Sequence, residues 1–189
     1  MKGVFIFLAD GFEDVEALGT GDVLRRGGVG AKYVSITGKP CVVSSHGVSV
    51  CADAVLSDLN PDDGAGADDF MIFPGGMPGS KALASSQALA DMMQAHYDRG
   101  GSLAAICAAP GLVLARLRDV GGLHFTCFDS FEDALVERGC VFEPVPVVRC
   151  GRIITGRSAG YALDFGLEIL KAIKGEAAAG KVREAMFLP

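Results

Sequence analysis

The sequence predicts an α/β protein whose doubly wound, mostly parallel sheet is sandwiched between helices. Uninterrupted apolar runs of strand length, such as Lys2–Ala9 and Ser102–Ile106, are typical of strands buried on both faces of a sheet. Segments with a helical spacing of apolar residues alternate with these runs along the chain. The 26 glycines suit tight turns and close contacts between helices and a sheet.

Length and composition indicate one domain spanning residues 1–189, since a compact domain commonly has about 150 residues. Half of the residues are hydrophobic and 21% are charged, which excludes wholesale disorder. The polar stretch Asn60–Asp69 is the best candidate for a linker. Strong elements flank it on both sides, so we interpret it as a surface loop within the one domain.

The net charge of −6 argues against nucleic acids and anionic membranes as partners. The apolar run Val4–Ala9 is too short for the core of a signal peptide, and the uncharged stretch Gly100–Ala115 is too short for a membrane-spanning helix. We therefore expect a soluble, cytoplasmic protein with reduced thiols. No two cysteines have C-x-x-C spacing, so we expect six free thiols. They are Cys41, Cys51, Cys107, Cys127, Cys140 and Cys150.

The first half of the chain is predicted to alternate strands and helices. One helix carries apolar residues at helical spacing and ends in two basic residues followed by two glycines, which is a helix stop. In order, we expect a strand at Lys2–Ala9, this helix at Glu13–Arg26, a strand at Ala31–Ile36, a small hairpin at Cys41–Cys51, a strand at Phe70–Phe73 and a helix at Ser80–Arg99.

The second half is predicted to continue the alternation and to end in two amphipathic helices. Ser130 is the expected N-cap of one of the shorter helices. In order, we expect a strand at Ser102–Ile106, a helix at Ala108–Leu117, a strand at Phe125–Phe128, a helix at Ser130–Arg138, a hairpin of Val145–Arg149 with Arg152–Thr155, and helices at Tyr161–Ile173 and Glu176–Ala185.

Cys107 occupies a strand-to-helix turn between Ser102–Ile106 and Ala108–Leu117. Ligands of an open parallel sheet bind beyond the carboxyl ends of its strands. The small residues Ala105 and Ala109 leave room for a sharp turn, which resembles a nucleophile elbow with cysteine in place of serine. Free N–H groups at the start of the helix would stabilise a thiolate. The alternative is that Cys107 is only a small buried hydrophobic residue.

Two other strand ends carry candidate partners for Cys107. Gly75 and Gly76 follow Phe70–Phe73, and their backbone N–H groups would form an oxyanion hole beside the cysteine. The alternative is an ordinary turn into the next helix. Four carboxylates follow the first strand, and spacing does not choose which one points towards the cysteine. They are Asp10, Glu13, Asp14 and Glu16.

Other sequence signals of a cofactor or metal are weak. Gly19-x-Gly21 lacks a third glycine and lies inside the predicted helix, so it is not a dinucleotide fingerprint, and the chain has no P-loop. No histidine has metal-ligand spacing, and we interpret His46, His96 and His124 as surface or hairpin residues. We therefore expect no cofactor and no metal.

Four segments in this order resemble the ThiJ/PfpI superfamily, in the branch of the parkinsonism-associated protein deglycase. The resemblance extends over essentially the whole chain, and the pair formed by Pro74-Gly75-Gly76 and the segment around Cys107 is highly specific. The four segments are residues 7–16 (FLADGFEDVE), 73–76 (FPGG), 104–110 (AAICAAP) and 155–160 (TGRSAG).

The resemblance implies a flavodoxin-like sandwich that works as a homodimer. It also selects Glu16 as the acidic partner of a reactive Cys107, with the N–H groups of Gly75, Gly76 and Ala108 at the oxyanion position. Deglycase, glyoxalase and stress-linked redox roles are attached to this branch, and peptidase and amidase names to the wider family.

Three positions depart from the family pattern. Ala108 stands where the peptidase-like branch places a histidine, and Phe128 stands where close relatives of the deglycase often carry one. A hydrolytic Cys–His mechanism is therefore disfavoured. His46 replaces an arginine of the hairpin, which weakens any transfer of dimer contacts.

The leading hypothesis is a cysteine-dependent deglycase or glyoxalase-like enzyme that acts on a small 2-oxoaldehyde or a glycated substrate. Cys107 would attack the carbonyl and Glu16 would shuttle the proton. The first alternative is a non-catalytic redox sensor or chaperone whose key event is Cys107 oxidation. A cysteine peptidase or amidase is the least favoured reading, because Ala108 leaves the thiol without an adjacent imidazole.

Overall fold

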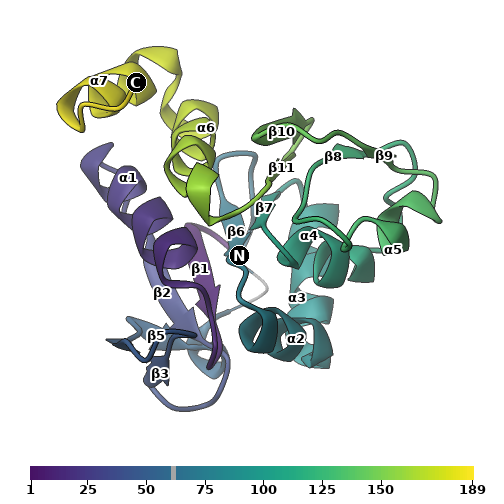
Figure 1. Cartoon of the computed structure of the whole chain (residues 1–189). Helices are drawn as coiled ribbons and strands as arrows, with labels where there is room; N and C mark the ends of the chain where they lie inside the picture. The colour runs from purple at the N-terminus through teal and green to yellow at the C-terminus, as the bar shows by residue number, and fades with distance from the viewer. Residues whose placement is uncertain (61–62) are drawn as a thin grey trace.

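The computed structural model describes residues 1–60 and 63–189, which form a central sheet with helices on both faces (Figure 1). Within these residues the main sheet has the strand order β10-β11-β7-β6-β1-β2-β5, and only β10 runs antiparallel to its neighbour. The strands are β1 (Val4–Leu8), β2 (Lys32–Ser35), β5 (Ala54–Val55), β6 (Phe70–Phe73), β7 (Ser102–Ile106), β10 (Val147–Cys150) and β11 (Ile153–Gly156). This is the flavodoxin-like α/β fold that the sequence predicts.

Two short ladders stand apart from the main sheet. The hairpin β3 (Cys41–Val43) and β4 (Ser49–Cys51) is antiparallel, as expected for Cys41–Cys51. The strands β8 (His124–Phe125) and β9 (Val141–Phe142) form a parallel pair.

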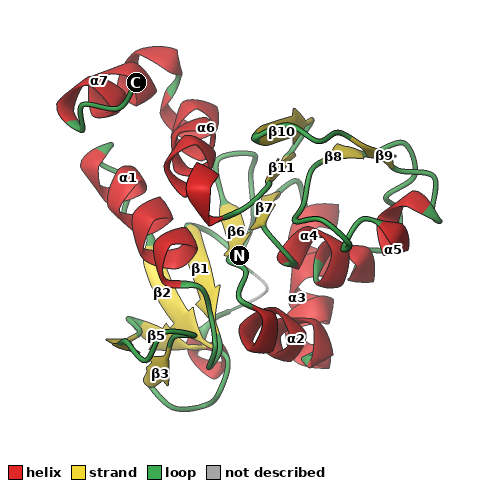
Figure 2. Ribbon diagram, viewed as in Figure 1, coloured by secondary structure: helices red, strands yellow, loops and turns green. Residues whose placement is uncertain are grey.

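The helices form two layers, seen as red ribbons on either side of the strands in Figure 2. One layer contains α1 (Thr20–Arg26), α6 (Ala162–Lys174) and α7 (Glu176–Ala185), and the other contains α2 (Met77–Ser85), α3 (Gln87–Asp98) and α4 (Ala109–Leu112). The helix α5 (Asp133–Val136) lies beside β9. Single turns complete the chain: the π-helical turn η1 (Val15–Gly19) and the 3-10 turns η2 (Leu56–Asp58), η3 (Leu114–Arg116) and η4 (Ala159–Tyr161).

The sheet separates two hydrophobic cores, which explains why β1 and β6 are apolar at every position. Phe7 and Phe73 stack with ring centroids 5.5 Å apart in the core under α2, α3 and α4. Ile6 and Ile72 point to the opposite face, into the core under α1, α6 and α7. Successive side chains of a strand alternate between faces, so both faces of β1 and β6 must be apolar.

Two predicted helices are shorter than expected. The segment Ser80–Arg99 is divided at Ser86, whose extended backbone ends α2 and whose side chain accepts the Leu89 N–H at the start of α3. The segment Ala108–Leu117 is a single α-helical turn followed by the 3-10 turn η3.

Two predictions in the region after α4 are wrong. The strand expected at Phe125–Phe128 stops at Phe125 and pairs with β9 rather than with the main sheet. Ser130 does not cap a helix, because it adopts a positive φ of 73° and α5 begins only at Asp133. The loop expected at Asn60–Asp69 includes residues 61–62, which lie outside the described residues.

The expectation of six free thiols is also wrong, because Cys41 and Cys51 form a disulfide across the β3–β4 hairpin. The two cysteines are ten positions apart, so they do not form a C-x-x-C motif, and the pairing of the two hairpin strands brings their sulfurs together. The remaining four cysteines are free.

His96 is not a surface residue. Its ring is buried, and Nε2 donates to the carbonyls of Asp69 and Ser102 at the starts of β6 and β7. Among the described residues, no helix combines the length and apolar character needed to cross a bilayer.

Candidate active site

The predicted site residues follow three neighbouring strands of the main sheet. Glu16 follows β1, Gly75 and Gly76 follow β6, and Cys107 follows β7. The strands β1, β6 and β7 are adjacent and parallel, so their carboxyl ends lie at one edge of the sheet. This is where an open parallel sheet binds its ligands.

Cys107 is held in a strained turn. Its φ of 64° is positive, which is uncommon for a residue other than glycine. The backbone is fixed on both sides: the Cys107 N–H donates to the Gly156 carbonyl at 3.0 Å, and the Cys107 carbonyl accepts the Phe128 N–H at 2.8 Å. The sulfur faces the backbone N–H groups of Gly76 and Ala108. A strained residue held by its surroundings in this way is typical of a functional position.

Gly75 is required by the close packing between Glu16 and Cys107. The Gly75 N–H donates to Glu16 Oε2 at 2.7 Å. A β-carbon on Gly75 would overlap Glu16 Oε2 and the β-carbon of Cys107. Gly76 has a positive φ of 88°, and a β-carbon there would overlap the backbone of residues 11–13. Only glycine at these two positions lets the backbone lie this close to Glu16, to Cys107 and to residues 11–13.

Glu16 is a buried carboxyl group that hydrogen-bonds with Cys107. Only 1% of the residue is exposed, and Oε1 accepts no N–H or O–H from the described residues. Burial raises the pKa of Glu16 to about 7, and the charge of Glu13 adds to the rise, while hydrogen bonds with Gly75 and Cys107 oppose it. The geometry thus chooses Glu16 among the four candidate carboxylates, because Asp10 and Asp14 bond with the hairpin instead.

The surroundings of Cys107 oppose a thiolate while Glu16 is ionised. Burial raises the pKa of the Cys107 thiol to about 12, and the negative charge of Glu16 contributes, whereas the N–H groups of Gly76 and Ala108 act in the opposite sense. The helix expected to lower this pKa is only the single turn α4. Cys107 and Glu16 therefore titrate as a pair that holds one proton between pH 7 and about 12.

The three histidines are bonded away from Cys107. His46 bonds with Asp14, His96 with the starts of β6 and β7, and His124 with Glu143. Phe128, at the position where relatives often carry histidine, is 47% exposed, and its backbone N–H donates to the Cys107 carbonyl. Glu16 is accordingly the titratable partner of Cys107.

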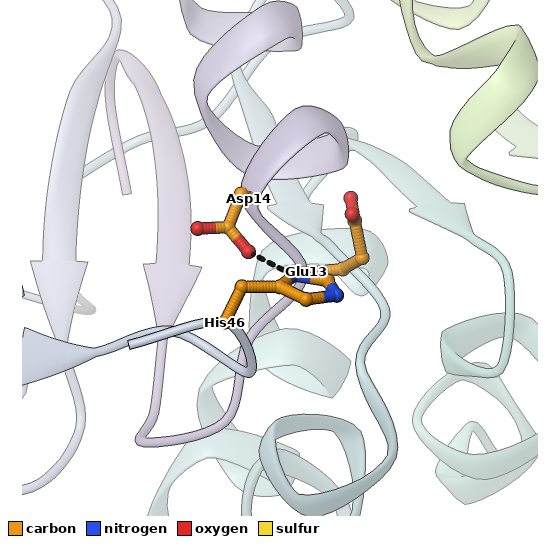
Figure 3. A group of neighbouring side chains, drawn as sticks. All are labelled: Glu13, Asp14 and His46. Atoms are coloured by element: carbon orange, nitrogen blue, oxygen red, sulfur yellow. Dashed lines mark hydrogen bonds and ion pairs between the residues drawn. The ribbon is translucent and has the colours of Figure 1, made fainter. Parts of the chain in front are cut away.

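A charged group beside the site was not predicted from the sequence. Figure 3 shows His46, at the tip of the β3–β4 hairpin, beside Asp14 and Glu13. His46 Nδ1 lies 2.6 Å from Asp14 Oδ2. One potential metal-ligand atom from each of the three residues lies within 4.8 Å of the other two. We assign no cation to the group, because Asp14 already bonds with His46 and Ser44, and Glu13 accepts the Glu16 N–H. His46 is 32 positions from Asp14, so local spacing could not reveal their contact.

The electrostatics of this group follow from its hydrogen bonds. Burial alone would raise the pKa of Asp14, but the hydrogen bonds of Ser44 and His46 hold it below its ordinary value. The hydrogen bond and charge of Asp14 raise the pKa of His46 in turn. His46 and Asp14 therefore each favour the charged form of the other, beside the segment that leads to Glu16.

The fold and the site define a class: flavodoxin-like proteins with a cysteine in a strained turn, a buried carboxyl partner and a glycine pair. The DJ-1/PfpI family matches residues 2–172, and the chain belongs to this family. The match confirms the family resemblance of the sequence motifs.

Individual relatives match this chain over most or nearly all of its length. The chain is 31% identical to protein dj-1beta of Drosophila melanogaster over 187 residues, covering 99% of this chain and 97% of that protein. It is 31% identical to the glutathione-independent glyoxalase DJR-1.2 of Caenorhabditis elegans, covering 86% of this chain and 83% of that one. The oxidized structure of Toxoplasma gondii DJ-1 has a TM-score of 0.90 and 27% identity, covering 100% of this chain and 99% of that chain.

Proposed function

We propose that the protein is a cysteine-dependent enzyme that converts 2-oxoaldehydes, or removes them from glycated substrates. The observation that carries this proposal is the pairing of Cys107 with the buried Glu16 carboxyl group, which holds a proton next to the sulfur. The similarity to a protein named as a glutathione-independent glyoxalase supports it. Catalysis needs no cofactor, since a nucleophile, a proton carrier and an oxyanion site suffice.

The reaction begins when the Cys107 sulfur forms a bond to the aldehyde carbon. The carbonyl electron pair moves to oxygen, which takes the proton of the pair and is held by the N–H groups of Gly76 and Ala108. The product is a hemithioacetal, and Glu16 is left as a carboxylate.

Glu16 then transfers protons between the two carbons of the adduct. It removes the proton from the sulfur-bearing carbon and returns it to the neighbouring ketone carbon, while the hydroxyl proton moves between the two oxygens. The result is a thioester of a 2-hydroxy acid. Water cleaves the thioester, so the 2-hydroxy acid leaves and the Cys107 thiol is restored. The sum is the addition of one water, without an external oxidant. In the deglycase reaction the C–N or C–S bond of the adduct breaks first: its electron pair leaves with the amine or thiol, which takes the hydroxyl proton of the adduct, and Cys107 then adds to the aldehyde that is released.

The test measures methylglyoxal consumption and lactate formation by the wild type and by three variants. We expect Cys107→Ala to fall to the rate without protein, and Glu16→Gln to lower kcat about 100-fold or more. Cys150→Ala is the matched control, because Cys150 is a free cysteine at the far end of β10 and should keep full activity. Unchanged turnover in Cys107→Ala would exclude the proposal.

A redox sensor remains the second candidate, because the structure of a similar protein is of its oxidized form. The N–H groups of Gly76 and Ala108 and a protonated Glu16 would stabilise the oxygens of a sulfinic acid at Cys107. No methylglyoxal turnover in either wild type or Cys107→Ala, together with selective oxidation of Cys107 by mild peroxide, would favour this function. Peptide hydrolysis is not expected, since no imidazole is next to the thiol.

We also propose a homodimer in which a second copy covers the apolar face formed by η1 and η4. Val15 on η1 is 51% exposed, and Tyr161 on η4 is exposed as well. Both turns contact α6, which links the two exposed side chains through one helix. Light scattering should give twice the chain mass, and Val15→Asp should reduce it to the monomer. A cytoplasmic location stays a prediction that cell fractionation would check.

A further inference from the structure

Cys41 and Cys51 are placed for a reaction that does not involve Cys107. They lie opposite each other in the β3–β4 register, with their Cα atoms 4.0 Å apart. Pro40 accepts the Ala52 N–H and Val48 accepts the Ser44 N–H, so bonded pairs flank the cysteines at every second position. Cys41 and Cys51 therefore form a non-hydrogen-bonded pair, in which opposing side chains are closest.

The hairpin is held in place by contacts other than the disulfide. Val42, between the sulfurs and the turn, is fully buried in the core under α1 and α6. The Val43 N–H donates to Asp10 and its carbonyl accepts the Gly11 N–H, while the Ser45 N–H donates to the Phe12 carbonyl. Breaking the S–S bond would therefore leave the strands paired and the two sulfurs adjacent, which is the requirement for the bond to form again.

The disulfide is also accessible. Cys41 and Cys51 are both exposed, whereas Cys127 and Cys140 are buried and Cys107 and Cys150 are half-buried. Thiol–disulfide exchange requires in-line attack on a sulfur by a thiolate, so exposure decides which bond reacts. Disulfides that are exposed are the labile and regulatory ones, and those that are buried resist reduction.

We propose that Cys41 and Cys51 form a reversible dithiol–disulfide couple, a second redox site that exchanges two electrons with small-molecule thiols. A thiolate of the reductant attacks one sulfur, and the other sulfur leaves as a thiolate and takes a proton. A second reductant thiolate then displaces the remaining cysteine from the mixed disulfide, and that cysteine also takes a proton. The protein gains two thiols, and the reductant becomes a disulfide. The reverse sequence oxidises the protein.

The hairpin that carries the couple also contacts the segment that leads to Glu16. The turn between β3 and β4 carries Ser44 and His46, and both bond with Asp14, two positions before Glu16. Figure 3 shows the contact of His46 with Asp14, next to the start of η1. The disulfide closes the same hairpin at the end of its strands away from this turn.

The test equilibrates the folded protein with graded ratios of reduced and oxidised dithiothreitol. Free thiols are then trapped with iodoacetamide and located by peptide mass spectrometry. We expect Cys41 and Cys51 to gain label together with one midpoint, to lose it together when the ratio is reversed, and to do so with an unchanged far-UV circular dichroism spectrum. Label at both cysteines under fully oxidising conditions, or reduction only when the protein unfolds, would overturn the proposal.

Single variants provide a second, independent measurement. In Cys41→Ser the remaining Cys51 has no partner to displace glutathione, so incubation with oxidised glutathione should leave a stable mixed disulfide at Cys51. The reduced wild type should instead close its own disulfide and release glutathione. Cys150→Ser is the matched control and should behave as the wild type. A mixed disulfide that persists equally in the wild type and in Cys41→Ser would contradict the couple. Because Cys107→Ala should leave all these results unchanged, the test is separate from that of the proposed enzyme activity.

Discussion

Glu16 and Cys107 lie in segments that follow β1 and β7, the two strands that flank β6, and their side chains meet as one hydrogen-bonded pair beside the Gly75 backbone. The two groups cannot ionise independently, because each anion raises the pKa of the other group. The pair loses its first proton near pH 7 and keeps the second to about pH 12. The chemistry of the site therefore depends on where this single remaining proton lies.

The reactivity of Cys107 should report the titration of the pair. We expect the rate of Cys107 alkylation by iodoacetamide to rise with an inflection near pH 7, since loss of the first proton allows a thiolate next to a protonated carboxyl group. In Glu16→Gln this inflection should disappear, and reactivity should rise only at higher pH. An inflection near pH 7 that survives in Glu16→Gln would show that Glu16 is not the partner.

The stability of the protein should depend on pH through Glu16. Its pKa rises from 4.5 to about 7 on folding because the carboxyl group is buried, so the folded state binds more protons in this range. The contribution of this group to stability is then fully present below pH 4.5 and is lost as pH rises to 7, by about 3 kcal/mol at about 1.4 kcal/mol for each pH unit. Denaturant unfolding of Glu16→Gln should lack this component and give a variant more stable than wild type at pH 8. A variant less stable than wild type at pH 8 would contradict the assignment.

Gly75→Ala should damage both the fold and the site, because a β-carbon there overlaps Glu16 and Cys107. We expect a loss of about 1–3 kcal/mol of unfolding free energy and loss of the pH 7 inflection. Gly180→Ala in α7 is the matched control, since a β-carbon there meets nothing within 4 Å. That variant should be as stable as wild type or slightly more, because alanine favours a helix interior. Equal effects of the two substitutions would refute the packing argument.

His96 should make the protein sensitive to acid in the opposite sense to Glu16. Burial lowers the pKa of His96 below 6.5, and its Nδ1 is buried without a partner among the described residues. The unfolded chain therefore takes up a proton that the folded protein excludes, so this contribution to stability is present above pH 6.5 and is lost as pH falls. In the Glu16→Gln background, where the opposing component is absent, unfolding free energy should decrease from pH 7 to pH 5. No decrease in that variant would exclude this role for His96.

The sequence by itself determined the class of fold and the cysteine at its centre. Continuous apolar runs predict strands with two covered faces, and β1, β6 and β7 are indeed buried along their whole length. The position of Cys107 at the end of such a strand placed it at the binding edge of the sheet without further information. These features are encoded locally, in runs of a few residues, so they can be read along the chain.

The tertiary structure alone decided which groups meet Cys107 and how they titrate. Spacing left Asp10, Glu13, Asp14 and Glu16 equivalent, and the π-helical turn η1 chose Glu16 by burying it against Gly75. Burial then raised the pKa values of both Glu16 and Cys107. For the thiol this is opposite to what its position at the start of a predicted helix indicates. The Cys41–Cys51 bond likewise depends on the register of the β3–β4 hairpin. The burial of His96 depends on contacts with Asp69, which is distant in the sequence. Desolvation and long-range contacts depend on the folded chain as a whole, and for that reason no local pattern could supply them.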